Sequence, residues 1–206
     1  MLISTAATRM ELLKLRRRLV IARRGHKLLK DKQELVMRKI LEMITTIKGQ
    51  RRKIAEQLNQ INTQLMYAKA MYGESNFKSA LSSSDRSINV KIGTRNIANI
   101  LVPMIEQVEF SGSIRNYDWT NTSGELDNAL LAMSDLTSAL LMLAINEKTL
   151  ELLAEELEKT RRRVNALEFV LIPSITETIK YITMKLGESE RASLVRLMRI
   201  KEILRS

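Results

Sequence analysis

The feature that most limits what this chain can fold into is a proline-free stretch over residues 8–72, in which apolar residues recur every three or four positions. That spacing aligns them along one side of an α-helix, and so long a stripe needs a partner helix of similar length to bury it. Thr8 and Glu11 have the spacing of a capping box and mark the predicted start. The stripe consists of Leu12, Leu15, Leu19, Ala22, His26, Leu29, Gln33, Val36, Ile40, Ile44, Ile47, Arg51, Ile54, Leu58, Ile61, Leu65, Ala68 and Tyr72.

A second run with the same spacing covers residues 125–206 and can supply the partner helix. Pro173 lies inside this run. Because proline has no N–H to donate and its ring crowds the preceding turn, we predict a helix kink there. If the two helices fold back on each other between Tyr72 and Leu126, residues that face each other have numbers that sum to about 198. Pro173 is then expected to face Gly25 and His26. The predicted apolar positions are Leu130, Met133, Leu136, Leu140, Leu143, Leu150, Leu153, Leu157, Val164, Leu167, Leu171, Ile175, Ile179, Ile182, Leu186, Leu197, Ile200 and Leu204.

The segment between the two helices contains the signals of a β-hairpin. Apolar and polar residues alternate from Ile88 to Ile92, which is the period of a strand. We expect residues 93–96 to turn the chain and residues 97–102 to return it, with Pro103 closing a hairpin at about 87–103. The apolar positions of the predicted hairpin are Ile88, Val90, Ile92, Ile97, Ile100 and Val102.

These elements predict a mainly α fold: a long antiparallel two-helix coiled coil formed by the N- and C-terminal helices, with a small central domain containing the β-hairpin. The composition agrees, since 4% aromatic residues, 7 glycines and 2 prolines among 206 residues are typical of long helices. The predicted divisions are residues 1–72, 73–124 and 125–206. Phe110, Tyr117 and Trp119 are expected to help seal the central domain.

The residue types that carry most active-site chemistry are scarce. There is no cysteine, which excludes disulfides and thiolate metal sites, and the single histidine, His26, falls on the predicted buried stripe. No glycine-rich phosphate loop is present. We therefore expect no catalytic residue, no cofactor and no metal site. We also expect no signal peptide and no membrane span, because the most apolar stretch, residues 126–145, is interrupted by Asp127, Asn128 and Asp135.

Positive charge is concentrated in the first helix. The formal net charge of the chain is +11, yet residues 1–72 carry 17 Lys and Arg against 5 Asp and Glu, whereas residues 125–206 carry 12 against 13. A strongly basic helix indicates an acidic partner. Nucleic acid is one alternative partner. Two observations count against it: aromatic residues are scarce, and the sequence contains no known nucleic-acid recognition module. A generic coiled-coil adaptor is the other alternative that the composition leaves open.

Four segments carry a more specific signal than the periodicity. They are TRMELLKLRRRL at residues 8–19, ARRGHKLLKDKQELVMR at residues 22–38, EELEKTRRRVNALEFVLIPSITETIKYI at residues 155–182 and KLGESERASLVRLMRIK at residues 185–201. These segments resemble the D subunit of V-type and A-type rotary ATPases, and the chain has the length of bacterial or archaeal members. The string TRRRVNALE, followed by Ile172 and Pro173, is the most specific part of the resemblance.

The resemblance implies a non-catalytic axle in the central stalk of a rotary ATPase, which couples ATP hydrolysis or synthesis on other subunits to ion transport. Its paired helices would enter a head of catalytic and non-catalytic subunits, of A and B type. The small F subunit of the stalk would bind the side of the helices, and the central domain would sit on the subunit that caps the rotor ring. Such an axle is cytoplasmic and peripheral to the membrane, without inserting into it.

We hypothesise that cationic side chains contact acidic loops of the head. One alternative is that these side chains only solvate the outer faces of the helices. Another is that the three consecutive arginines of the second helix serve helix packing and pair with acidic neighbours such as Glu42. The predicted contact residues are Arg16, Arg17, Arg18, Arg23, Arg24, Lys27, Arg161, Arg162 and Arg163.

Overall fold

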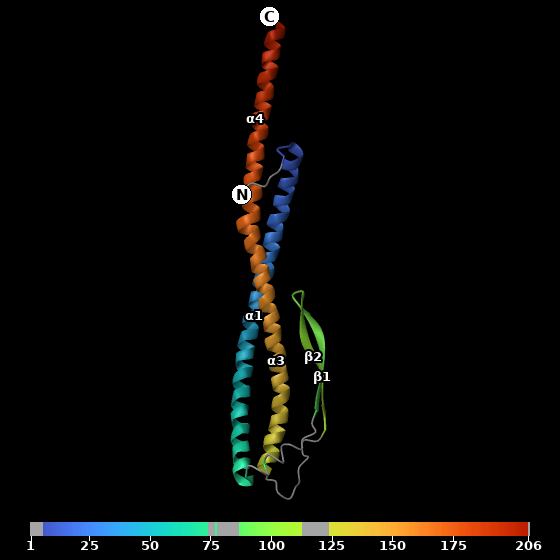
Figure 1. Ribbon diagram of the computed structural model, residues 1–206, viewed down its shortest axis with the longest axis vertical. Helices are drawn as coiled ribbons and strands as arrows, with labels where there is room; N and C mark the ends of the chain where they lie inside the picture. The colour runs from blue at the N-terminus through green and yellow to red at the C-terminus, as the bar shows by residue number, and fades with distance from the viewer. Residues whose placement is uncertain (1–5, 74–76, 78–86, 113–123, 206) are drawn as a thin grey trace. The chain divides into compact units, whose positions relative to one another are not determined.

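The computed structural model describes residues 6–73, 77, 87–112 and 124–205. Its elements are helix α1 (Arg9–Tyr72), strands β1 (Ser87–Ile97) and β2 (Ile100–Ser111), helix α3 (Gly124–Asn165), a π-helical turn η2 (Ala166–Leu171) and helix α4 (Ile172–Arg205) (Figure 1). The predicted fold class is confirmed, since an N-terminal and a long C-terminal helical region flank one antiparallel hairpin. Tyr117 and Trp119 lie outside the described residues, and Phe110 lies in β2 and is 38% exposed, so their role in sealing the central domain remains a prediction.

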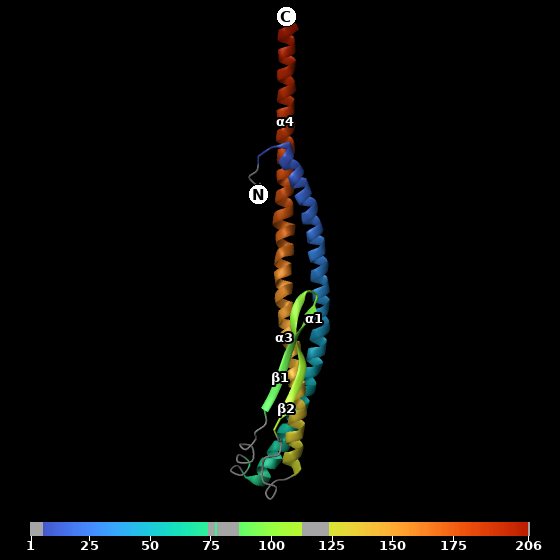
Figure 2. The same ribbon diagram turned by 90° about the vertical axis from the view of Figure 1, so that its right-hand side faces the viewer.

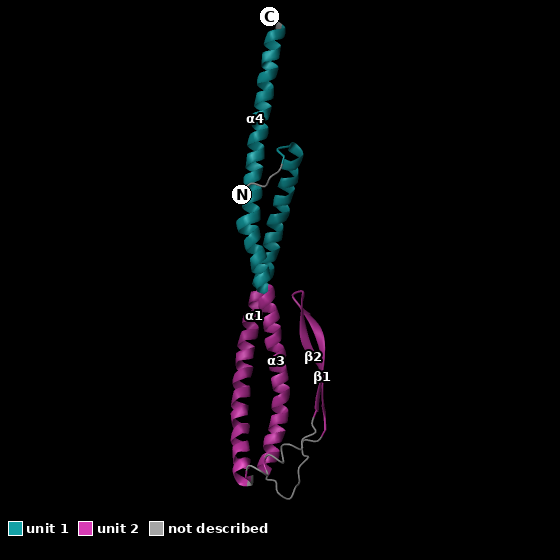
Figure 3. Ribbon diagram, viewed as in Figure 1, with its two compact units in different colours: residues 1–35, 157–206 teal, residues 36–156 magenta. Residues whose placement is uncertain are grey.

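The chain divides into two compact units (Figure 3). Unit 1 consists of residues 1–35 and 157–206, and unit 2 consists of residues 36–156. Each unit therefore contains a part of α1 and a part of the C-terminal helical region. The division into an N-terminal helix, a central domain and a C-terminal helix remains a prediction.

Helix α1 is capped at both ends by local contacts. The backbone N–H of Glu11 donates to Oγ1 of Thr8 at 3.3 Å, which satisfies one of the free N–H groups of the first turn. At the other end, the N–H of Gly73 donates to the carbonyl oxygen of Lys69 at 3.1 Å. Gly73 has a φ of 75°, the left-handed conformation in which glycine commonly ends helices.

In unit 1, the predicted apolar stripe of α1 packs against α4. The core consists of Leu12 and Leu15 with Ile175 and Ile182, and Leu15 and Ile182 are 1% and 0% exposed. Each such side chain contributes about 1.5–3 kcal/mol through removal from water. At the edge of this core, Nη2 of Arg9 lies 2.6 Å from Oε1 of Glu190, and both side chains are largely exposed. The order of these contacts shows that α1 and α4 are antiparallel.

In unit 2, the same stripe packs against α3. Ile54 and Ile61 form the core with Leu136, and smaller side chains of α3, Ala132 and Ala139, fit beside them. Polar pairs continue the helix pairing. Nδ2 of Asn146 donates to Oε1 of Gln50 at 3.0 Å.

Arg51 is the one described member of the predicted α1 stripe that is exposed. Its guanidinium forms an ion pair with Glu147 at 2.7 Å instead of entering the core. The hydrogen bond and the opposite charge of Glu147 raise the pKa of Arg51 above its ordinary value. Because a guanidinium is charged at every ordinary pH, this pair does not respond to neutral pH.

The predicted stripe of the second helix is wrong at several positions. Leu197, Ile200 and Leu204 are 62%, 53% and 81% exposed, because α1 begins at Arg9 and no part of it covers the end of α4. Met133, Leu140 and Leu171 are also exposed. Several buried positions of the second helical region are absent from the predicted stripe. Apart from Leu126 they are small or polar residues: Ala129, Thr149, Thr160 and Thr178.

The hairpin differs from its predicted register. The strands pair from Ser87 with Ser111 to Ile97 with Ile100, so the turn is formed by two residues, Ala98 and Asn99. Both have positive φ, 53° and 65°, as a two-residue turn of type I′ requires. The predicted turn at residues 93–96 and the predicted end at Pro103 are therefore wrong. The turn at Ala98 and Asn99 fixes the register of the strands, whereas Gly93 lies inside β1.

Gly93 has a different role, inside β1. A Cβ at this position would lie 2.1 Å from Oε1 of Glu106, whose side chain lies over the glycine. The register shifts between Lys91 and Ile92, which leaves Glu106 as the extra residue of a β-bulge. Of the predicted hairpin positions, Val102 is buried, Val90, Ile97 and Ile100 are half-buried, and Ile88 and Ile92 are exposed.

Close to Pro173 the helix widens into the π-helical turn η2. The N–H of Ile172 donates to the carbonyl oxygen of Leu167, a bond across five residues. Since Pro173 cannot donate the next helical hydrogen bond, the wider turn is a local way to accommodate it. The kink at Pro173 itself remains a prediction. The Nε2 atom of His26 lies 3.2 Å from Oε2 of Glu168, and the expected position of His26 opposite Pro173 remains a prediction.

Replacing Ile61 by alanine should lower the free energy of unfolding by about 2–5 kcal/mol, because it leaves a cavity in the core of unit 2. The matched control is Met66→Ala on the next turn of α1, where the side chain is 74% exposed and a change of about 0.5 kcal/mol or less is expected. Chemical denaturation followed by circular dichroism measures both variants. Equal losses would contradict the assignment of Ile61 to the core.

Candidate partner-binding surfaces

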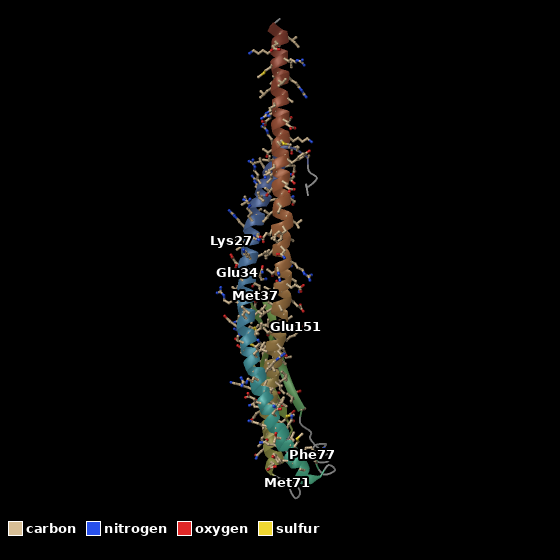
Figure 4. All side chains as sticks on the ribbon, turned by 90° about the vertical axis from the view of Figure 1, so that its left-hand side faces the viewer. Lys27, Glu34, Met37, Met71, Phe77 and Glu151 are labelled. Carbon is tan, nitrogen blue, oxygen red and sulfur yellow. The ribbon has the colours of Figure 1, made fainter. Side chains whose placement is uncertain are left out.

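The nine cationic residues predicted to contact a partner all lie in unit 1, and all are exposed. Leu12, Leu15 and Ala22 are the side chains that α1 buries in this region, so the cations between them project from its other sides. Figure 4 shows Lys27 on the outer surface of α1. We call the nine residues the basic surface: Arg16, Arg17, Arg18, Arg23, Arg24, Lys27, Arg161, Arg162 and Arg163.

The basic surface is not one compact patch. Arg16, Arg17 and Arg18 are consecutive, and successive residues of an α-helix lie about 100° apart, so these side chains point in different directions. Arg23 lies one heptad after Arg16 and therefore on the same side of α1. On α3, Arg162 forms an ion pair with Glu158. The arrangement gives a helix with positive charge on several sides.

Exposed apolar side chains lie among these cations, and the sequence analysis did not identify them. Ile21 and Leu28 are 69% and 70% exposed, and Met10, Leu13 and Val20 are also on the surface. The sequence contains a signal that could have identified them. Ile21 and Leu28 are seven residues apart, so they share one side of the helix, and neither belongs to the buried stripe. Contiguous exposed apolar area is typical of protein–protein contacts. The N-terminal part of α1 therefore offers both charge and apolar contact area.

The π-helical turn adds a second apolar group to unit 1. Phe169, Val170 and Leu171 are 72%, 63% and 42% exposed. Their neighbour Glu168 is the residue that contacts His26 of α1. π-Helical turns occur frequently at functional sites in proteins. We therefore regard this turn as part of the candidate binding surface, although the sequence analysis predicted only a kink nearby.

The end of α4 forms a third exposed surface. Beyond Glu190, which contacts Arg9 at the start of α1, no other helix in the described part of the chain lies beside α4 (Figure 1). Cations are interspersed along this part, among them Arg196 and Arg199. We call its apolar side chains the terminal surface: Leu194, Val195, Leu197, Met198, Ile200, Ile203 and Leu204.

Within the described residues, the helical stretch Gly124–Leu204 contains one 18-residue window that is long and apolar enough to cross a membrane. The mean hydropathy of this window is 1.6. One such window is weak evidence for a membrane helix. Only 11% of the window is buried, which identifies an unusually apolar helix with much of its surface uncovered.

Comparison with known proteins decides the family. A family model described as the D subunit of ATP synthase matches residues 11–202, which include almost all of α1, the hairpin and the C-terminal helices. The chain belongs to the D-subunit family of ATP synthases. The basic surface, the π-helical turn and most of the terminal surface lie inside the region that this family model matches.

Curated relatives from V-type and A-type enzymes agree with this result. The D subunit of the V-type ATP synthase of Acetivibrio thermocellus is 44% identical over 200 residues, covering 96% of this chain and 90% of the relative. The corresponding V-type protein of Clostridioides difficile is 46% identical over 199 residues, covering 96% and 90%. The D subunit of the A-type ATP synthase of Methanopyrus kandleri is 43% identical over 198 residues, covering 96% and 85%.

Titratable groups in the described part of this family member are surface groups. No three His, Asp or Glu side chains there are grouped so that they could hold a metal ion. Besides Arg51, Lys148 has a raised pKa, because its ammonium donates a hydrogen bond to Glu151 at 2.7 Å and gains from the opposite charge. Both shifted groups belong to ordinary exposed ion pairs.

Removing residues 192–206 should barely change the stability of the isolated chain, because α1 does not cover this part of α4. We expect the melting temperature to change by less than about 2 °C. Binding to the other proteins of the ATP synthase should weaken, because the truncation removes the terminal surface. Thermal melting and reconstitution of the complex measure the two effects, and a large loss of stability in the isolated chain would contradict this description.

Proposed function

We propose that the chain is the rotor axle of the central stalk in a V/A-type rotary ATPase. In this role it couples ATP hydrolysis or synthesis in the catalytic head to ion translocation through rotation. The observation that carries the proposal is the family match over residues 11–202, together with relatives that are named as D subunits of V-type and A-type ATP synthases. Members of this family are parts of a membrane-associated ATP synthase complex.

An axle must transmit torque, so neighbouring helices must not slip past one another. The cores of both units support this role. In unit 1, Leu15 and Ile182 are almost completely buried, and in unit 2 Ile61 is 3% exposed. Because each buried side chain contributes about 1.5–3 kcal/mol, slipping of the helices would expose several of them at once. An axle needs no bond chemistry, and we propose that the chain is non-catalytic and that partner subunits carry the ATP chemistry.

An axle must also present a different surface to each catalytic site of the head. The surfaces of α1 and of the π-helical turn in unit 1 differ in charge and apolar area, as Arg23 and Ile21 on α1 and Phe169 in the turn illustrate. We infer that the basic surface, the π-helical turn and the terminal surface contact the catalytic and non-catalytic subunits of A and B type. Exposed ion pairs are worth about 0.2–1 kcal/mol each, which suits contacts that must break during rotation.

The remaining partners are proposed on the same basis. We infer that the small F subunit of the stalk binds the side of the helices. We further infer that the end of unit 2 near Tyr72 and Gly124 sits on the subunit that caps the rotor ring. The chain would then be on the cytoplasmic side of the membrane, peripheral to it, and would not enter the bilayer.

Charge reversal at Arg23→Glu and Arg24→Glu should lower the coupled ATPase rate of the reconstituted complex by about two- to tenfold, because two weak ion pairs with the head become repulsive. The isolated double variant should keep the helix content and melting temperature of the parent chain, since both side chains are exposed. ATPase turnover and circular dichroism are the measurements.

The matched control is Arg52→Glu with Lys53→Glu, two adjacent cations that are exposed on the part of α1 in unit 2. This pair makes the same change in net charge outside the basic surface. The control should retain most of the ATPase rate. An unchanged ATPase rate in the Arg23 and Arg24 variant, or an equal loss of ATPase rate in the control, would contradict the proposed contact with the head.

A further inference from the structure

The hairpin of unit 2 runs beside α3 and leaves an open groove between them. The hairpin lies next to α3 in both views (Figure 1 and Figure 2). A cavity of about 460 Å³ separates the two elements. Val102, Met104 and Ile105 line it from the hairpin, Met142 and Ile145 from α3, and Met43 from α1. We call this space the hairpin groove.

The hairpin groove extends onto the surface of the helix pair. A smaller cavity of about 170 Å³ adjoins it and shares Met43 and Asn146 with it. The smaller cavity reaches along α1 to Ile47 and to Lys39, which is paired with Glu42 at 2.9 Å. The two cavities together are lined by the hairpin, by α3 and by α1 from Lys39 to Ile47. A lining that spans about three turns of α3 together with the hairpin suits a segment of chain better than a compact small molecule.

The lining of the hairpin groove is apolar with one charge. Three methionines, Met43, Met104 and Met142, line it, and methionine is the side chain that adapts most easily to the shape of a bound partner. Arg95 is the one charged residue in the lining. It forms no ion pair with another residue in the part of the chain that the structure describes. An occupant that matches this lining is apolar with an acidic side chain placed near Arg95.

The geometry favours a helix over a strand as the occupant. A strand adds to a sheet through backbone hydrogen bonds at its edge, whereas this space faces the side chains of the hairpin and of α3. A helix enters such a space with one apolar ridge, using residues three, four and seven positions apart. A two-stranded hairpin is also only marginally stable by itself, so a helix packed on its apolar face would stabilise it.

We propose that the hairpin groove is the docking site for an amphipathic helix from a neighbouring subunit, whose Asp or Glu pairs with Arg95. The proposal rests on the proposed function, because it requires that the chain works in a multi-subunit complex. It adds a specific interface in unit 2, separate from the head contacts of unit 1. The charge of Arg95 orients the helix, and the methionines provide the apolar contact.

The test uses the absence of cysteine in this chain. In the purified, assembled complex, Ser138→Cys places a single thiol in the groove lining, where a benzophenone-maleimide label can be attached. The control Thr63→Cys places the same label on an exposed position of α1 in the same unit. After illumination, peptide mapping should find the groove label joined to one helix of one partner protein, at an apolar position with Asp or Glu within one or two turns.

A second arm tests the charge. Arg95→Glu should weaken association with the cross-linked partner by about five- to tenfold, and reversal of the acidic residue on the partner helix should restore it. The control Lys91→Glu makes the same charge change in the same strand, at a residue that hydrogen-bonds Gln107 and does not line the groove. It should have little effect on the association.

Three results would overturn the proposal: no cross-link from the groove label, a cross-link to an extended segment, or equal weakening by the Arg95 and Lys91 variants. Protection of the Ser138→Cys thiol by decanoate in the isolated chain, without a cross-link in the complex, would overturn it in favour of a small amphiphile. If the parent chain fails to assemble with the ATPase subunits, the proposed function fails. If it assembles and no helix is cross-linked, only the docking site fails.

Discussion

The structure depends on burial of one apolar stripe of α1 against the C-terminal helices, separately in each unit. A helix with a single neighbour can bury only one side, and the stripe from Leu12 to Ala68 is that side. Where the stripe is covered, as at Leu15 and Ile61, the helices are held at a fixed register. Where no other described helix covers it, as after Glu190 on α4, even a regular apolar pattern stays in contact with water.

This burial pattern explains why so many apolar side chains lie on the surface. Two paired helices enclose little volume, so side chains such as Ile21 and Phe169 remain exposed although they are strongly apolar. In a multi-subunit complex, that surface becomes contact area between subunits. We propose that the cations that accompany it contribute long-range attraction and orientation to such contacts more than affinity. Membership in a family of ATP synthase components accounts for so much exposed apolar area on a small chain.

Polar residues inside the helix pair are satisfied locally. Thr178 is 1% exposed, and its hydroxyl donates to the carbonyl oxygen of Ser174 at 2.7 Å on its own helix. A threonine bonded in this way can replace a larger apolar residue in the core at little cost, because no polar group is left unpaired. Such positions, with Thr160 and Ala129, are the ones that a search for regularly spaced leucines does not find.

The sequence by itself determined the helices, the buried side of α1, the presence of a hairpin and the family. Periodicity and caps are local properties, so Thr8 and the stripe could be recognised without coordinates. The tertiary structure decided what covers each stripe, because the period shows which side chains share a face and not what lies opposite. It also decided the hairpin register, which depends on positive φ at Ala98 and Asn99. The hairpin groove forms only because β2 and α3 face each other, and no local sequence pattern specifies the separation between these two elements.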